Sequence, residues 1–147
     1  MEQDYVRQAA IVMASLELLP AQPSDLTGIL RDPDQFHALV DLNAQTYETE
    51  LVGYLRANLD TARIEHWHKQ LDTLIVNEVA LPVLAADMPG MPGYPARLAK
   101  CWDAPPILFA NNVIREDQAS VAIIGSRAAK QDTLDATHAL AADLAVG

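Results

Sequence analysis

The spacing of apolar residues changes near residue 78, and this change restricts the fold more than any other feature. Before it, apolar residues recur at helical spacing, and prolines and capping residues divide the stretch into short helices. After it, apolar residues come in short runs such as "VALPVLAAD" (79–87), which are typical of strands. We therefore predict an α+β chain, with a small helical domain at 1–77 and the start of an α/β domain at 78–147.

Capping residues place the predicted helices of the first domain. Ser24 and Asp32 are predicted N-caps, and Pro33 suits the first position of a helix because its fixed φ is already helical. A further helix is predicted over 46–55. Asp60 is predicted to cap a longer one that carries the apolar residues Ile64, Trp67, Leu71, Leu74 and Ile75.

The second domain is predicted from short segments. "MPGMPGYP" (88–95) holds three prolines and two glycines, so it is a connector. One or two turns of helix are predicted in 94–101, and a short strand over 107–109. "SVAIIGS" (120–126) is a continuous β-branched run, which favours a strand buried on both faces of a parallel sheet. A helix is predicted from residue 133 onward.

The charge is distributed unevenly along the chain. The net charge is −10, but residues 1–92 carry −9 and residues 93–131 carry +2. An anion-binding face is therefore expected in the second stretch, although a weakly charged surface without a partner also fits. The cations of that stretch are Arg97, Lys100, Arg115, Arg127 and Lys130.

Composition argues for a cytoplasmic protein that has no membrane contact. Cys101 is the single cysteine, which excludes a disulfide framework and a thiolate zinc cluster. The acidic N-terminus does not resemble a signal peptide, and no apolar run reaches the ~20 residues that span a bilayer.

No catalytic or metal site is predicted. His66 and His68 are two residues apart, so on a helix they point to different sides, whereas metal-binding pairs are three or four apart. Cys101, beside Trp102, is interpreted as a buried thiol. No Ser/His/Asp arrangement is found, so we expect no enzyme activity and no cofactor.

Gly125-Ser126-Arg127 is the candidate binding motif. A glycine lets a ligand approach the backbone, and the following helix offers free N–H groups and a positive dipole end to an anion. Ser126 can donate its hydroxyl, and Arg127 can hold a phosphate through two parallel hydrogen bonds. An ordinary strand–helix turn with a surface arginine remains the alternative.

Two sequence motifs in a fixed order point to a particular family more specifically than either motif does alone. "YPARLAKCWDAPPILFANN" (94–112) is followed by "SVAIIGSR" (120–127), and together they resemble the DNA-processing protein A family, known as DprA or Smf. The matching residues are Tyr94, Pro95, Leu98, Asp103, Pro105, Pro106, Leu108 and Phe109, then 121–127.

The resemblance implies a recombination mediator that binds single-stranded DNA and loads a RecA-type recombinase, typically in natural transformation of competent cells. It implies a sterile-alpha-motif-like helical domain, an extended Rossmann-like domain and a homodimer of the full-length protein, without catalysis. By position, Gly125, Ser126 and Arg127, with Lys130 after them, would contact phosphates. Tyr94, Pro95, Leu98 and the 103–108 segment would be structural.

The chain also departs from the family pattern. Lys130, Asp132 and Thr133 stand where the family has an aromatic-glycine pair, and the later strands of the family's sheet are absent. We therefore expect a fragment or a truncated form. Two alternatives stay open: a nucleotide-binding Rossmann-like sensor or enzyme, and a protein-interaction module that uses the acidic helical domain.

Overall fold

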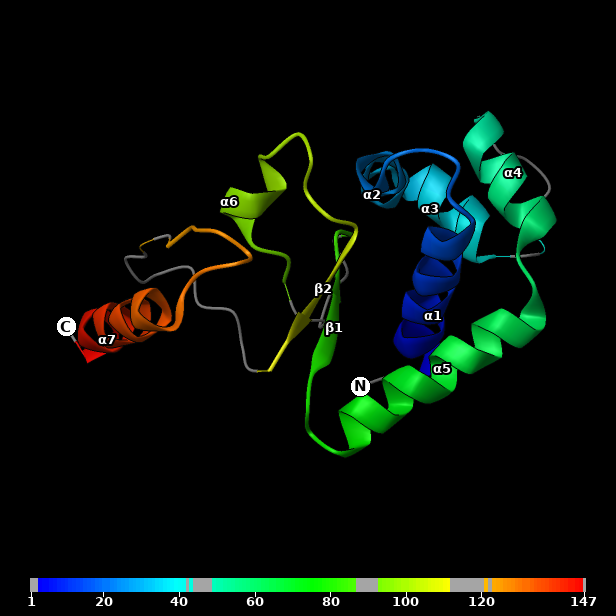
Figure 1. Ribbon diagram of the computed structural model, residues 1–147. Helices are drawn as coiled ribbons and strands as arrows, with labels where there is room; N and C mark the ends of the chain where they lie inside the picture. The colour runs from blue at the N-terminus through cyan, green and yellow to red at the C-terminus, as the bar shows by residue number, and fades with distance from the viewer. Residues whose placement is uncertain are drawn as a thin grey trace. The chain divides into compact units, whose positions relative to one another are not determined.

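The computed structural model describes residues 3–41, 43, 49–86, 93–111, 121 and 123–146. Within these residues the protein is α+β and mostly helical, with seven helices and two strands (Figure 1). The chain divides into two compact units, Met1–Glu116 and Asp117–Gly147, and each is described here by itself.

Five helices make up most of the first unit, as the apolar spacing predicts. They are α1 (Gln3–Leu18), α2 (Pro23–Arg31), α3 (Pro33–Val40), α4 (Glu50–Asn58) and α5 (Thr61–Val76).

Two of the predicted helix starts are confirmed by their capping hydrogen bonds. The Asp32 carboxylate accepts hydrogen bonds from the backbone N–H groups of Asp34 (3.1 Å) and Gln35 (3.4 Å) at the start of α3. The Asp60 carboxylate accepts one from Ala62 N–H (2.9 Å) at the start of α5. These caps satisfy N–H groups that have no partner inside the helix, which is why local sequence is enough to predict them.

Two other predicted starts need correction. Ser24 is not an N-cap, because α2 begins at Pro23 and Gln22 precedes it. A proline at the first helical position has a preset φ, and this outweighs the hydroxyl of the residue after it. The helix predicted over 46–55 is α4, which begins only at Glu50, with the Thr49 hydroxyl accepting from Val52 N–H at 3.3 Å. Positions 44–48 lie outside the described residues.

The core of the first unit is built around α1, which packs along α5 (Figure 1). Trp67 of α5 is half-buried and packs against this core, which confirms its predicted packing role. Two adjacent alanines in α1, Ala9 and Ala10, are fully buried and let neighbouring elements come close. The other buried α1 side chains are Tyr5, Val6, Ile11, Val12, Ala14 and Ser15.

The two predicted short strands form one antiparallel pair. β1 (Leu81–Leu84) and β2 (Ile107–Ala110) are hydrogen-bonded in a register that sets Leu81 opposite Ala110 and Leu84 opposite Ile107. The predicted turn of helix between them is α6 (Ala96–Ala99). Both strands are therefore confirmed, and they pair with each other in the antiparallel sense.

Side-chain hydrogen bonds tie this small sheet to the helices. The buried Tyr5 hydroxyl of α1 donates to Pro82 O (3.0 Å) and accepts from Leu84 N–H (3.0 Å). The Thr27 hydroxyl of α2 donates to Ala104 O at 2.6 Å, close to the start of β2. The sheet thus belongs to the same compact unit as the five helices, while the predicted domain boundary at 77/78 stays a prediction.

The predicted strand at 120–126 is wrong for its described residues. Val121 and positions 123–126 have no strand pairing, and the Ile124 side chain is 94% exposed. An unpaired buried strand would leave its N–H and C=O groups without partners, and β1 and β2 use each other for that purpose. Among the described residues this segment is therefore an exposed, irregular approach to α7 (Gln131–Val146), the predicted final helix. The sterile-alpha-motif-like and Rossmann-like assignments stay predictions.

Tyr5→Phe tests the connection between α1 and the sheet. We expect a loss of about 1–3 kcal/mol in the free energy of unfolding, because Leu84 N–H would be buried without a partner. Burial raises the pKa of Tyr5, so the folded chain holds this proton more tightly than the unfolded chain. The stability that this adds is present below the ordinary tyrosine pKa of about 10 and is lost above it. Denaturant titrations of wild type and variant at pH values below and above about 10 measure both the loss on substitution and its dependence on pH.

Tyr54→Phe is the matched control, because Tyr54 is 43% exposed on α4. Its midpoint of unfolding should stay at the wild-type value. Equal stability of the Tyr5→Phe variant and the wild type would contradict the anchoring role of Tyr5.

The end of α5 carries a strained residue. Glu78 has a φ of 55°, in the left-handed region that normally favours glycine. Its N–H donates to Ile75 O (3.1 Å), and Val79 N–H donates to Leu74 O (2.9 Å), which are the two bonds of a Schellman motif. The turn into β1 depends on this geometry.

Glu78→Gly should stabilise the first unit by about 0.5–1 kcal/mol, because relief of the left-handed strain exceeds the extra entropy of the unfolded chain. Glu65→Gly is the control, since Glu65 lies in the interior of the same helix and is also exposed. That substitution should destabilise the protein by about 0.5–1 kcal/mol. Thermal unfolding of both variants measures these changes. Destabilisation by both substitutions would contradict the claim that the left-handed backbone of Glu78 is strained.

Candidate nucleic-acid interface

The residues of the Gly125-Ser126-Arg127 motif form an exposed turn ahead of α7 in the second unit. The Ser126 hydroxyl oxygen accepts a hydrogen bond from Ala128 N–H at 3.0 Å, which holds the turn. This bond does not use the hydroxyl proton. Ser126 therefore supports the turn and keeps the donor that the sequence analysis assigned to it.

Arg127 and Lys130 supply the positive charge of this turn. Both side chains are exposed, and within the described residues no carboxylate forms an ion pair with either of them. Arg63 of α5 differs, because it donates to both carboxylate oxygens of Glu17 and thereby lowers the pKa of Glu17. The charges of Arg127 and Lys130 are thus available to an anion from solution.

Acidic side chains occupy the first turns of α7. Lys130 O accepts the first helical hydrogen bond, from Leu134 N–H at 3.0 Å. The Asp132 carboxylate accepts from Thr133 N–H (2.9 Å), and Asp135 accepts from the Gln131 amide (2.8 Å). A carboxylate suits the positive helix end but repels a phosphate there. The start of α7 itself is therefore unfavourable for a phosphate.

The surroundings of Gly125 are open. A methyl group at this position would meet no described atom within 4 Å, and the backbone is not left-handed. The fold of this turn therefore does not demand glycine.

The other family motif lies in the first unit and closes a loop. The Tyr94 hydroxyl donates to Pro105 O at 2.7 Å, and burial raises the pKa of this hydroxyl. Pro95 directly precedes α6, and Pro106 is buried where β2 begins. Of the remaining motif residues, Leu98 and Leu108 are half-buried and Asp103 is exposed. These contacts support the structural role predicted for the motif, which stays a prediction.

The predicted burial of Cys101 is wrong. Cys101 is exposed, and the Trp102 side chain beside it is 81% exposed. The reason is the tight end of α6, where Cys101 N–H donates to Leu98 O (3.0 Å) and Ala104 N–H donates to Cys101 O (3.3 Å). Sequence reasoning missed Trp102 as a surface residue, although Lys100 and Asp103 close to it favour exposure.

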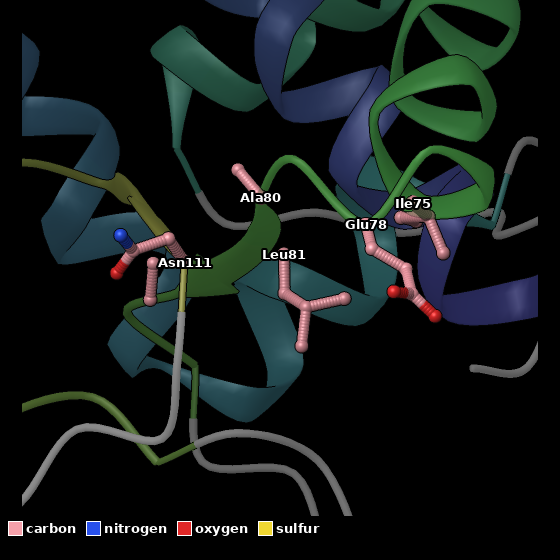
Figure 2. Close-up of a pocket in the computed structure, with 6 residues that line it drawn as sticks. Ile75, Glu78, Ala80, Leu81 and Asn111 are labelled. Atoms are coloured by element: carbon pink, nitrogen blue, oxygen red, sulfur yellow. The ribbon is translucent and has the colours of Figure 1, made fainter.

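A hollow of about 160 Å³ lies between the end of α5 and the sheet (Figure 2). Its lining is mainly apolar, and Glu78 contributes the one carboxylate. A carboxylate repels phosphate, so this hollow does not suit the anionic ligand expected at the cationic turn. The lining residues are Ile75, Glu78, Ala80, Leu81, Ala110 and Asn111.

In the described part of the chain, no three His, Cys, Asp or Glu side chains gather in a way that could hold a metal ion. None of its helices combines the length and the apolar character needed to cross a bilayer.

Comparison with known proteins gives one match, and it contains both motifs. Residues 87–147 match the model of the family described as DNA recombination-mediator protein A. The match covers less than half of the chain and includes the turn at 125–130. The curated proteins gave no match, and the solved structures gave none either.

The exposed turn that carries Arg127 and Lys130 lies within the segment that matches this family. This match over residues 87–147 to the DNA recombination-mediator protein A (DprA) family confirms the resemblance found in the sequence. In general terms, this match supports a role in DNA processing as a recombination mediator.

Gly125→Ala separates folding from binding at this turn. Because the site is open, we expect the free energy of unfolding to stay within about 0.5 kcal/mol of wild type. Gly28→Ala is the matched control: Gly28 is also open but lies inside α2, so the variant should gain about 0.5–1 kcal/mol. Chemical denaturation measures both, and a clear loss for Gly125→Ala would mean that the fold needs this glycine.

Proposed function

We propose that this chain binds single-stranded DNA through the turn at 125–130 and acts as a recombination mediator for a RecA-type recombinase. One observation carries the proposal: Arg127 is exposed, has no ion-pair partner among the described residues, and lies in the segment that matches the recombination-mediator family.

The chemistry of the turn suits a phosphate backbone. The guanidinium of Arg127 can make two parallel hydrogen bonds to one phosphate, and Lys130 adds a second charge. Ser126 and the backbone N–H groups can donate to the same oxygens. Contacts of this kind go to phosphates and not to bases, so binding should depend little on sequence.

The charges nearby limit the size of this contact. Asp132 and Asp135 follow the two cations directly, so the backbone of the nucleic acid has no favourable path along α7. With two phosphates neutralised, the logarithm of the affinity should fall against the logarithm of salt with a slope of about −1.4. The slope is modest because only two cations, Arg127 and Lys130, act at this turn.

The protein partners follow from the family alone. A RecA-type recombinase and a homodimer of the full-length protein are what the family resemblance implies. We propose a binding role without catalysis, in which the DNA is held and passed on unchanged.

Arg127→Ala is expected to weaken the binding of single-stranded oligonucleotides of every sequence alike, and to reduce the salt slope by about 0.7. Fluorescence anisotropy at several salt concentrations measures both quantities. Arg7→Ala is the matched control, because Arg7 is an exposed arginine of α1 in the acidic part of the chain. It should leave affinity and slope unchanged.

Unchanged affinity and slope for Arg127→Ala would remove Arg127 from the site. Thermal stabilisation of the chain by a small nucleotide, together with no binding of oligonucleotides, would overturn the proposal in favour of a nucleotide sensor or enzyme.

A further inference from the structure

Trp102 is the most exposed aromatic side chain among the described residues. It is 81% exposed, whereas tryptophans are on average highly buried because their large apolar surface is costly to hydrate. Trp67, the other tryptophan, is half-buried against the core. The folding of the first unit therefore does not account for the position of Trp102.

Hydrogen bonds on both sides fix the turn that carries Trp102. Tyr94 O–H binds Pro105 O (2.7 Å), and Thr27 O–H binds Ala104 O (2.6 Å). At the end of α6, Cys101 N–H donates to Leu98 O (3.0 Å). The indole is thus presented from a backbone that is held before any ligand arrives, and this lowers the entropic cost of binding.

The charges around Trp102 are mainly positive. Arg97 and Lys100 are exposed and three residues apart on the turn of α6, so they lie on the same side of it. Asp103 is the only carboxylate residue in the whole of 93–111. Within an acidic chain, this is a local surface of two cations and one exposed aromatic ring.

We propose that Trp102 is a stacking platform for a base of single-stranded nucleic acid, with Lys100 and Arg97 holding the adjacent phosphates. An exposed aromatic face beside cations is the arrangement that binds unpaired bases, because every base has a face that can stack. Double-stranded DNA keeps its bases stacked internally and offers no such face.

The chemistry of the neighbours favours nucleic acid over a protein partner. Protein interfaces that centre on tryptophan surround it with apolar contacts and are poor in lysine. Here Lys100 lies two residues before Trp102 and an acid follows directly after it, both exposed. A phosphate backbone uses the lysine charge, whereas an apolar partner would have to desolvate it.

This inference rests on the proposed function, since both concern single-stranded DNA. It adds a contact in the first unit that stacks on a base beside two phosphate contacts, whereas the turn at 125–130 contacts phosphates alone. The two contacts can be separated experimentally, because stacking alters tryptophan emission and a phosphate contact at Arg127 does not.

The test uses the 147-residue chain carrying Trp67→Phe, which leaves Trp102 as its only tryptophan. Titration with a short oligothymidylate should quench the Trp102 emission in parallel with the binding measured by anisotropy. The equivalent duplex should quench it much less. This arm leaves Trp102 itself unchanged, so the fold at the site is not disturbed.

Three variants complete the test, with circular dichroism as a check of folding. Trp102→Ala should weaken oligothymidylate binding at least about fivefold, whereas Trp102→Phe should retain most of the affinity. Tyr54→Ala is the matched control, because Tyr54 is an exposed aromatic on α4, one turn after Glu50. It should bind as wild type does.

Each contrary outcome has one meaning. Binding by anisotropy without quenching, together with normal affinity of Trp102→Ala, overturns the stacking role and leaves the proposed function intact. Emission that changes with protein concentration alone, with a dimer in sedimentation, overturns it in favour of a contact between copies of the chain. Absence of any oligonucleotide binding overturns the proposed function and this inference together.

Discussion

The first unit depends on the hydroxyl group of Tyr5. A two-stranded sheet of four-residue strands is not stable alone, because it buries too little apolar surface. Tyr5 bonds both Pro82 O and Leu84 N–H, so the central helix α1 acts as the missing partner for part of β1. Thr27 does the same for the segment that enters β2, through Ala104 O. Two side chains from the N-terminal helices thereby position a sheet that lies about eighty residues away in sequence.

The binding surfaces we propose lie where exposed cations are concentrated in the chain. The helices of the first unit are acidic, and their arginine at position 63 is paired with Glu17. The cations at α6 and at the turn 125–130 belong to the stretch with a net positive charge. Both surfaces are exposed, and both lie within the region that matches the recombination-mediator family. Phosphate contacts at one and base stacking at the other would together distinguish single strands from duplexes.

The sequence alone was enough to predict the features that depend on residues close together in the chain. The caps at Asp32 and Asp60 involve groups within three residues, so they are visible in the sequence, as are the two short strands at 81–84 and 107–110. The strand at 120–126 was predicted wrongly, because a strand exists only where another strand pairs with it, and composition does not show pairing. The predicted burial of Cys101 is wrong for a similar reason, since hydrogen bonds around a tight turn decide its exposure. The candidate residues at 125–130 were named from the sequence, and the structure adds that the carboxylates of Asp132 and Asp135 bond within the start of α7 directly after them.

The most direct test of this account is a comparison of backbone amide NMR spectra of the chain with and without a short oligothymidylate. The account predicts shifts for Ser126 to Lys130 and for the turn that carries Lys100 and Trp102, with both sets weakening as salt rises. The amides of α3, which carries Asp34 and is capped by Asp32 and Asp41, should stay in place. Shifts confined to the acidic helices, or no shifts at low salt, would contradict the claim that these exposed cations bind single-stranded DNA.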